Sequence, residues 1–236
     1  MQNKKFDVAK KSLDEVTLFF NKNISSAREK SMYYALIPNC YIEYFSKTGQ
    51  VATGLAYLQE HEKTINSYSS PLSYLNQIRA YILIANLFFI AKEFKKGAAY
   101  LLKIKDLSTS WKPSNDFGFT FLFLDLLFHF EMGHNDILPF MTRSVSRVVQ
   151  KKEKMLKAEK IFLDFMKKIP PSTNKEELGN AFTKFKKQLL PLVKDKEEKI
   201  FFEVFDYISW IESKIKNVSF ASVIKEKYEA TTKKAS

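Results

Sequence analysis

Residues that make tight turns are scarce in this chain, which has six glycines and seven prolines among 236 residues. All-β folds need many tight turns, so this scarcity argues against them and favours long helices. A glycine-rich loop of the P-loop or dinucleotide-binding type is also missing, and the sequence therefore shows no cradle for a phosphate group.

Cysteine is nearly absent as well, because Cys40 is the only one. No intramolecular disulfide can form, which fits a reducing compartment. Residues 1–20 alternate lysine with apolar residues and lack the apolar core of a secretory leader, so we expect a cytoplasmic location. Cys40 lies in an apolar helical stripe without a basic neighbour, and we interpret it as a core thiol rather than a nucleophile.

Arginine is scarce among the basic residues. The net charge is +12, yet only four of the 38 basic residues are arginine. The segment from Arg143 to the C-terminus contains 22 basic and 13 acidic residues. Proteins that contact bases or phosphates rely on arginine, so a lysine-dominated surface favours a solvated helix face. RNA or DNA binding by this region stays the alternative function, with Arg143, Arg147, Lys151 and Lys152 as its candidate contacts.

Apolar residues, by contrast, make up 45% of the chain and include 22 phenylalanines. They recur at three- and four-residue spacing, which predicts an all-α fold of about ten or eleven helices. The expected helices are 6–21, 25–47, 51–68, 72–91, 95–107, 117–132, 136–168 with a break near 151–154, 175–193, 197–216 and 220–228. "IPPSTN" interrupts the helical pattern, with Ser172 or Thr173 as the expected N-cap of the next helix. The final residues from Glu229 have nothing to bury and should fray.

The densest apolar run, "FGFTFLFLDLLFHFEMGHNDI", extends from Phe117 to Ile137. Its core ends at Phe130 and is too short to cross a bilayer, which needs about 20 apolar residues. Asp125 in its middle would be costly in lipid. A helix that is apolar on nearly all sides is covered on several sides, so we predict a buried inner helix.

Three windows of the chain align by their turns at Gly49, Lys92 and Gly133. An aromatic residue precedes each turn, and a small residue follows the first two turns, at Gly54 and Gly97. This pattern resembles the tetratricopeptide repeat, whose signature spacing is matched best by Tyr81, Ile84, Ala85, Phe88, Phe94, Gly97 and Leu101. The resemblance implies an α-α superhelix of antiparallel helical hairpins.

A second resemblance covers residues 116–228, which end in the block "FDYISWIESKI". This region is similar to the C-terminal part of uncharacterised bacterial tetratricopeptide-like proteins. The similarity implies a fold and no activity. It predicts one helical-repeat domain, with hairpins in 1–168, capping helices in 169–230 and a disordered tail in 231–236.

Tetratricopeptide folds bind peptides on the concave face made by the first helix of each hairpin. The resemblance therefore implies Asn39, Glu43, Arg79 and Asn86 as candidate peptide-binding residues. A solvated Arg79 and an Asn86 bonded within the array are the simpler alternative. The lysines with which the family clamps a C-terminal carboxylate have no matching positions here.

Catalytic and metal-binding patterns are weak. Asp125 and His129 share a helix face, but a zinc site needs further ligands at recognisable spacing, so an ion-paired or hydrogen-bonded duo is the simpler interpretation. We therefore expect no enzyme activity, no cofactor, no metal and no membrane span. The predicted function is a scaffold that binds a protein segment in a concave helical groove.

Overall fold

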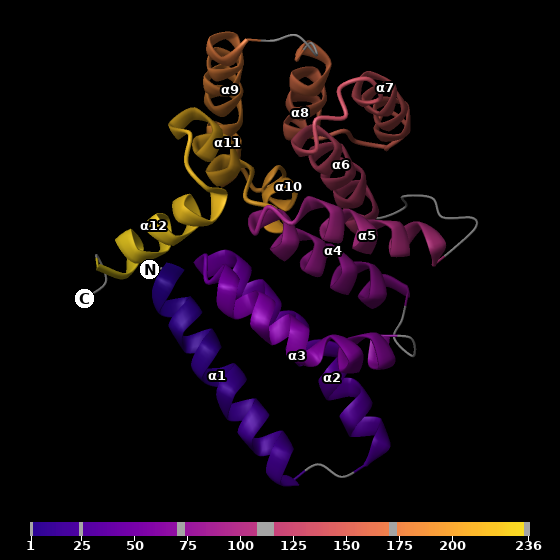
Figure 1. The fold of residues 1–236 in the computed structure, drawn as a ribbon, viewed down its shortest axis with the longest axis vertical. Coiled ribbons are helices and arrows are strands. Elements are labelled where there is room, and N and C mark those ends of the chain that lie inside the picture. Colours follow the sequence, from indigo (N-terminus) through magenta and orange to yellow (C-terminus); the bar gives the residue numbers. More distant parts are fainter. Residues whose placement is uncertain (1, 24–25, 70–73, 108–115, 170–173, 234–236) are drawn as a thin grey trace. The chain divides into compact units, whose positions relative to one another are not determined.

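A computed structural model describes residues 2–23, 26–69, 74–107, 116–169 and 174–233. In these residues the chain is helical and has no strand, as the periodicity predicts. The helices, drawn in Figure 1, are α1 (Gln2–Asn23), α2 (Ala27–Thr48), α3 (Val51–Ser69), α4 (Tyr74–Ile90), α5 (Phe94–Asp106), α6 (Asp116–Glu131), α7 (Leu138–Val149), α8 (Lys157–Lys168), α9 (Lys175–Leu189), the 3-10 helix η1 (Leu190–Lys194), α10 (Lys199–Glu203), α11 (Tyr207–Lys216) and α12 (Phe220–Lys233).

Two compact units make up the chain. The first contains Met1–Thr109 and Ile224–Ser236, and the second contains Ser110–Val223. The division near Val223 falls inside α12. The sequence instead predicted that the repeat hairpins end at residue 168 and that capping helices begin at residue 169. Each unit has its own set of buried side chains, and the packing of each is described separately below.

The turns at residues 49, 92 and 133 share one geometry. Gly49, Lys92 and Gly133 all adopt the left-handed conformation, with φ of 72°, 62° and 71°. In each, the N–H of the following residue donates to the carbonyl five residues back, which satisfies a free carbonyl at the helix end. These bonds run from Gln50 to Phe45 at 3.0 Å, from Glu93 to Phe88 at 2.9 Å and from His134 to His129 at 3.0 Å. The structure therefore confirms a turn at all three aligned positions.

In the first unit, α2 packs against α3 and α4, α3 packs against α4, and α4 packs against α5. The helices approach closely at Gly54 in α3. A Cβ atom there would lie 2.9 Å from the Cβ of Phe45 in α2 and 3.0 Å from Cδ1 of Leu87 in α4. Only glycine leaves room for this contact, as the sequence pattern of small residues at helix crossings predicts.

The C-terminal turns of α12 are held against α1 within the first unit. The hydroxyl of Tyr228 donates to Asp7 at 2.7 Å, and its ring meets Phe6 edge-on with centroids 6.3 Å apart. α12 extends to Lys233, five residues beyond the expected helix end at residue 228. The three residues that follow lie outside the described part of the chain.

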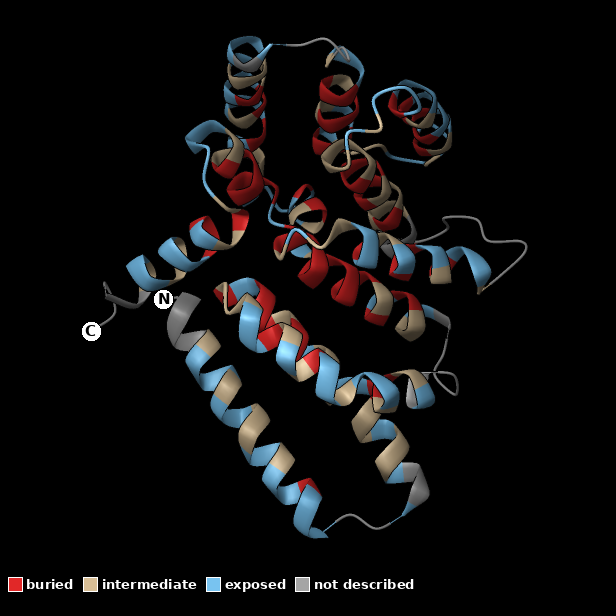
Figure 2. Cartoon of the chain, viewed as in Figure 1, coloured by how far each residue is buried: buried red, intermediate tan, exposed pale blue. Residues whose placement is uncertain are grey.

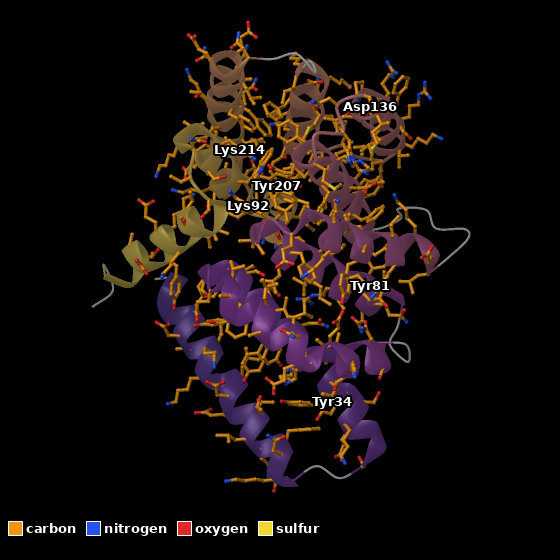
Figure 3. All side chains as sticks on the ribbon, in the orientation of Figure 1. Tyr34, Tyr81, Lys92, Asp136, Tyr207 and Lys214 are labelled. Atoms are coloured by element: carbon orange, nitrogen blue, oxygen red, sulfur yellow. The ribbon has the colours of Figure 1, made fainter. Side chains whose placement is uncertain are left out.

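The second unit is built around α6, α8, α9 and α11, as the burial colours of Figure 2 show. The predicted inner helix is confirmed: six of its apolar side chains are almost fully buried, namely Phe121, Phe123, Leu124, Leu126, Leu127 and Phe128. Phe162 of α8 meets Phe123 of α6 and Tyr207 of α11 edge-on. Figure 3 shows Tyr207 among the packed side chains of this unit.

The N-caps of α9 and α11 differ from prediction. Asn174, rather than Ser172 or Thr173, caps α9, since its side chain accepts from the N–H of Glu177 at 2.8 Å. The two predicted caps lie outside the described residues. The segment 197–216 is split, because Asp206 caps a new helix by accepting from the N–H of Ser209 at 2.9 Å. The expected break near 151–154 is confirmed by the gap between α7 and α8.

Candidate functional site

The ion pair between Glu43 and Arg79 links α2 to α4 in the first unit. Nη2 of Arg79 lies 3.3 Å from one carboxylate oxygen of Glu43, and Nζ of Lys47 lies 2.8 Å from the other. The structure thus brings together two of the four residues proposed to bind peptide. We call Glu43, Lys47 and Arg79 the charge cluster.

One acid faces two bases in the charge cluster, so its net charge is positive. Burial tends to raise the pKa of Glu43, but the hydrogen bond and charge of Lys47, followed by those of Arg79, outweigh burial and lower this pKa below its usual value. Glu43 is therefore ionised at neutral pH. The surplus positive charge of the cluster is free to attract an acidic group of a ligand.

Exposed apolar side chains occur on the same two helices as the charge cluster. Met32 and Leu36 of α2 are 59% and 49% exposed, and Leu75 of α4 is 46% exposed. Leu75 lies one helical turn before Arg79. We call Met32, Leu36, Leu75 and the charge cluster together the α2–α4 face. Apolar surface beside a few charges is typical of surfaces that bind other proteins.

Cys40 lies between Leu36 and Glu43 on α2 and is exposed, so its interpretation as a core thiol is wrong. The apolar stripe that contains it continues through Leu36, which also faces outward. The residue as a whole is exposed, but partial burial of its sulfur raises the pKa of the Cys40 thiol, the Glu43 carboxylate adds to the rise, and Arg79 opposes it. The thiol is therefore protonated at neutral pH and is a poor nucleophile.

The two asparagines of the predicted site lie differently. The side-chain N–H of Asn39 donates to the carbonyl of Ala35 in its own helix at 2.9 Å. Its Oδ1 is buried and accepts no hydrogen bond from any described residue. Asn86 is only 7% exposed, because α4 is covered around most of its circumference from Ile82 onward (Figure 2). Of the four candidates, only Glu43 and Arg79 form a pair at the surface.

The four candidate nucleic-acid contacts also separate into two groups. Arg143, Arg147 and Lys151 are exposed on one side of α7 and just beyond its end. Lys152 is instead mostly buried, with Nζ 2.7 Å from Glu159 and 4.3 Å from the ring centroid of Phe119. Lys152 is therefore held inside the second unit, and three exposed cations remain.

A pair of buried carboxylates at the start of α8 was missed by the sequence analysis. Glu198 is almost fully buried and accepts the backbone N–H groups of Lys157 and Ala158, each at 2.9 Å. Glu159 reaches back to the N–H of Leu156 at 2.9 Å. The position of Glu159, three residues after Leu156, is a recognisable capping signal, whereas Glu198 is 40 residues further along the chain than Ala158.

Beside these carboxylates lies a cavity of about 20 Å³, lined by residues that include Thr120, Glu159 and Tyr207. This volume holds about one water molecule and no organic ligand. Burial raises the pKa of the Tyr207 phenol, and the nearby Glu159 carboxylate adds to the rise. Both carboxylates of this region bind the backbone at the start of α8, so the arrangement stabilises a helix N-terminus.

His129 contacts His134 as well as Asp125. Nε2 of His129 lies 3.9 Å from Oδ1 of Asp125, and its Nδ1 lies 2.8 Å from Nδ1 of His134. The turn at Gly133 brings His134 back toward the end of α6. Within the described residues, no group of three or more His, Cys, Asp or Glu side chains is arranged to hold a metal ion.

No family model matches the chain, and comparisons with curated proteins and with solved structures find no match either. The class that the coordinates define is therefore a helical protein with adjacent packed helices and two compact units. Among the described helices, none combines the length and the apolarity that a membrane span requires.

Proposed function

We propose that this chain is a non-enzymatic scaffold that binds a segment of a protein partner on the α2–α4 face. The observation that carries the proposal is the position of exposed Met32, Leu36 and Leu75 on the two helices that Glu43 and Arg79 link. Apolar side chains supply affinity, and the positive charge cluster orients an acidic group of the partner. The expected cytoplasmic location belongs to the same proposal.

A tetratricopeptide-like superhelix is part of this proposal. In such an array the first helices of successive hairpins pack side by side, which corresponds to the contact between α2 and α4. The shared cap at Gly49, Lys92 and Gly133 supports hairpins of one type, and the close contact at Gly54 supports their packing. The concave face of the proposed array would then be the α2–α4 face.

The expected affinity follows from the exposed area. Fully burying a leucine or methionine contributes about 1.5–3 kcal/mol, so three side chains that are roughly half exposed can add about 3 kcal/mol in total. This amounts to about two orders of magnitude in affinity. Main-chain contacts and a carboxylate near Arg79 must supply the rest, and a micromolar complex with an extended or helical peptide is expected.

Peptide display against the purified chain tests the proposal. Selected peptides should combine apolar residues with Asp or Glu. The variant L36Q/L75Q should weaken a selected peptide about tenfold or more, and R79Q should weaken peptides that carry an acidic residue. The matched control L102Q changes an exposed leucine of α5 that is outside the α2–α4 face. It should leave the affinity unchanged.

Two results would contradict the proposal. The first is equal loss of binding in L36Q/L75Q and L102Q, which would indicate that the peptide binds nonspecifically to exposed leucines. The second is purification from a lysate in which nucleic acid accompanies the chain while no protein does. Circular dichroism melts of each variant check that the exposed substitutions leave the first unit folded.

A further inference from the structure

The outward side of α7 carries a second surface that the proposed scaffold function does not use. α7 packs against α6 and α8, and its inward side chains are buried. Its opposite side presents Phe140, Arg143 and Arg147, and Lys151 follows one turn after Arg147. Phe140 is 66% exposed. We call these four residues the α7 surface.

The cations of the α7 surface have no acidic partner among the residues that the structure describes. None of the ion pairs in the described part of the chain includes Arg143, Arg147 or Lys151, in contrast to the buried pair of Lys152 with Glu159. Arg143 and Arg147 are four residues apart within α7, so a helical rise of 1.5 Å per residue spaces them by about 6 Å along the axis, and Lys151 lies in the turn that follows α7. They form a positive row without internal neutralisation.

The aromatic ring at one end of this row is already in contact with a cation. The guanidinium carbon of Arg143 lies 4.7 Å from the ring centroid of Phe140. A flat guanidinium over a flat ring leaves planar faces on which a further ring can stack. Such a combination of an exposed aromatic, a planar arginine and a row of cations matches a ligand that has both aromatic rings and regularly spaced negative charges.

We propose that the α7 surface binds single-stranded nucleic acid without sequence preference. A base stacks on Phe140 and Arg143, because unpaired bases stack on aromatic rings and guanidinium planes. Arg147 and Lys151 bind the phosphates that follow, and the arginine can bind a phosphate with two parallel hydrogen bonds. A duplex has its bases stacked inside and binds more weakly to this surface.

A lipid membrane fits the α7 surface less well. Helices that lie in a membrane interface bury a continuous apolar side. The apolar side of α7 is already buried within the second unit, and beyond Phe140 only Ile137, at 39%, counts among the exposed large apolar side chains near it. One phenylalanine and one isoleucine give a small apolar area for insertion, whereas a single ring suffices to stack a base.

Fluorescence anisotropy with labelled 20-residue oligo(U) and oligo(dT) tests the proposal on the full chain. F140A should weaken binding about tenfold through loss of one stacked base. R143Q/R147Q/K151Q should also make the slope of log affinity against log salt concentration less steep by about 1.4, because Arg147 and Lys151 bind phosphates and each phosphate contact to a single strand contributes about 0.7. The control K184Q/K187Q/K194Q removes the same charge from exposed lysines of α9 and η1 and should change the slope by less than about 0.5.

Several outcomes would overturn the proposal. Equal effects of the two triple variants would show that net charge alone attracts the oligonucleotide. Unchanged binding by F140A would remove the stacking contact. Binding to vesicles with 30% anionic lipid that is lost in F140A would assign the surface to membranes. Melting curves and competition by an unlabelled duplex complete the set, and competition by the duplex equal to that by oligo(U) would contradict single-strand preference.

Discussion

The close contact of α3 with α2 and α4 leads to a sharp prediction about Gly54. In Gly54→Ala, the added Cβ would lie 2.9 Å from the Cβ of Phe45 and 3.0 Å from Cδ1 of Leu87. Ordinary carbon contacts lie at about 3.5–4.0 Å, so the methyl group needs at least half an ångström that the structure does not provide. The Cβ of Phe45 is fixed to the backbone of α2 and cannot move unless the helix moves.

The magnitude follows from two opposing effects. Replacing a helical glycine by alanine contributes up to about 1 kcal/mol through helix propensity. Overpacking a well-packed core costs about 1–3 kcal/mol. Because the contact involves a backbone-anchored atom, we expect overpacking to dominate and the free energy of unfolding to fall by about 1–2 kcal/mol. For a unit of roughly 120 residues, this lowers the midpoint of thermal unfolding by about 4–8 °C.

Gly179→Ala in α9 is the matched control, because nothing lies within 4 Å of the Cβ it would add. It gains helix propensity alone and should stabilise its unit by about 0.5–1 kcal/mol. Thermal and urea unfolding, followed by circular dichroism, compare the two variants with the parent chain. If Gly54→Ala is as stabilising as Gly179→Ala, the close approach of the helices is refuted.

Three more predictions test other contacts. Glu198→Ala should lower the free energy of unfolding by about 1–3 kcal/mol in urea titrations, because two backbone N–H groups lose their acceptor. The control Glu197→Ala changes an exposed neighbour and should alter the free energy of unfolding by less than about 1 kcal/mol. Equal effects of the two variants would contradict the capping role of Glu198. The basic neighbours of Glu43 lower its folded pKa below the unfolded value, so its ionised form adds stability above the unfolded pKa, and this contribution is lost as pH falls through the folded pKa. The difference in free energy of unfolding between the parent and Glu43→Gln should therefore shrink during acid titration to pH 3. A constant difference would be inconsistent with the ion pairs. Tyr228→Phe removes the hydrogen bond to Asp7 and should speed amide exchange in the last turns of α12, whereas unchanged exchange would show that this bond does not hold the helix end.

The parts of the fold that could be predicted are governed by local rules. Helical periodicity placed most helices within a few residues of their observed bounds. The turn at Gly133 was visible because glycine adopts a left-handed conformation without strain. Lys92 takes the same conformation without being glycine, and it was found only through alignment with the glycine turn at Gly49.

Contacts between distant parts of the chain could not be predicted from one sequence. Tyr228 meets a residue 221 positions away, so the helical end of the chain looked like an unsupported tail. Glu198 appeared to be one surface charge among many, although it is almost fully buried at the start of α8. Asp206 was hidden inside a continuous apolar pattern, where its capping role gave no break in periodicity.

Exposure was the least predictable property of the candidate site. Glu43 and Arg79 were expected on one face, and the structure pairs them. Cys40 was assigned the wrong environment, because helical periodicity identifies an apolar stripe without showing which neighbouring helix covers it, and Asn86 is buried, as the simpler of its two alternatives expects. The same uncertainty applied to Lys152, which sequence alone cannot distinguish from the exposed Lys151.

The proposed binding face is tested most directly by hydrogen–deuterium exchange of the chain with and without a display-selected peptide. We predict slower exchange in the segments 32–47 of α2 and 75–79 of α4 when the peptide is bound, with no change in α7. Protection confined to α7, or to no segment of α2 and α4, would contradict the assignment of the α2–α4 face as the site that binds a protein partner.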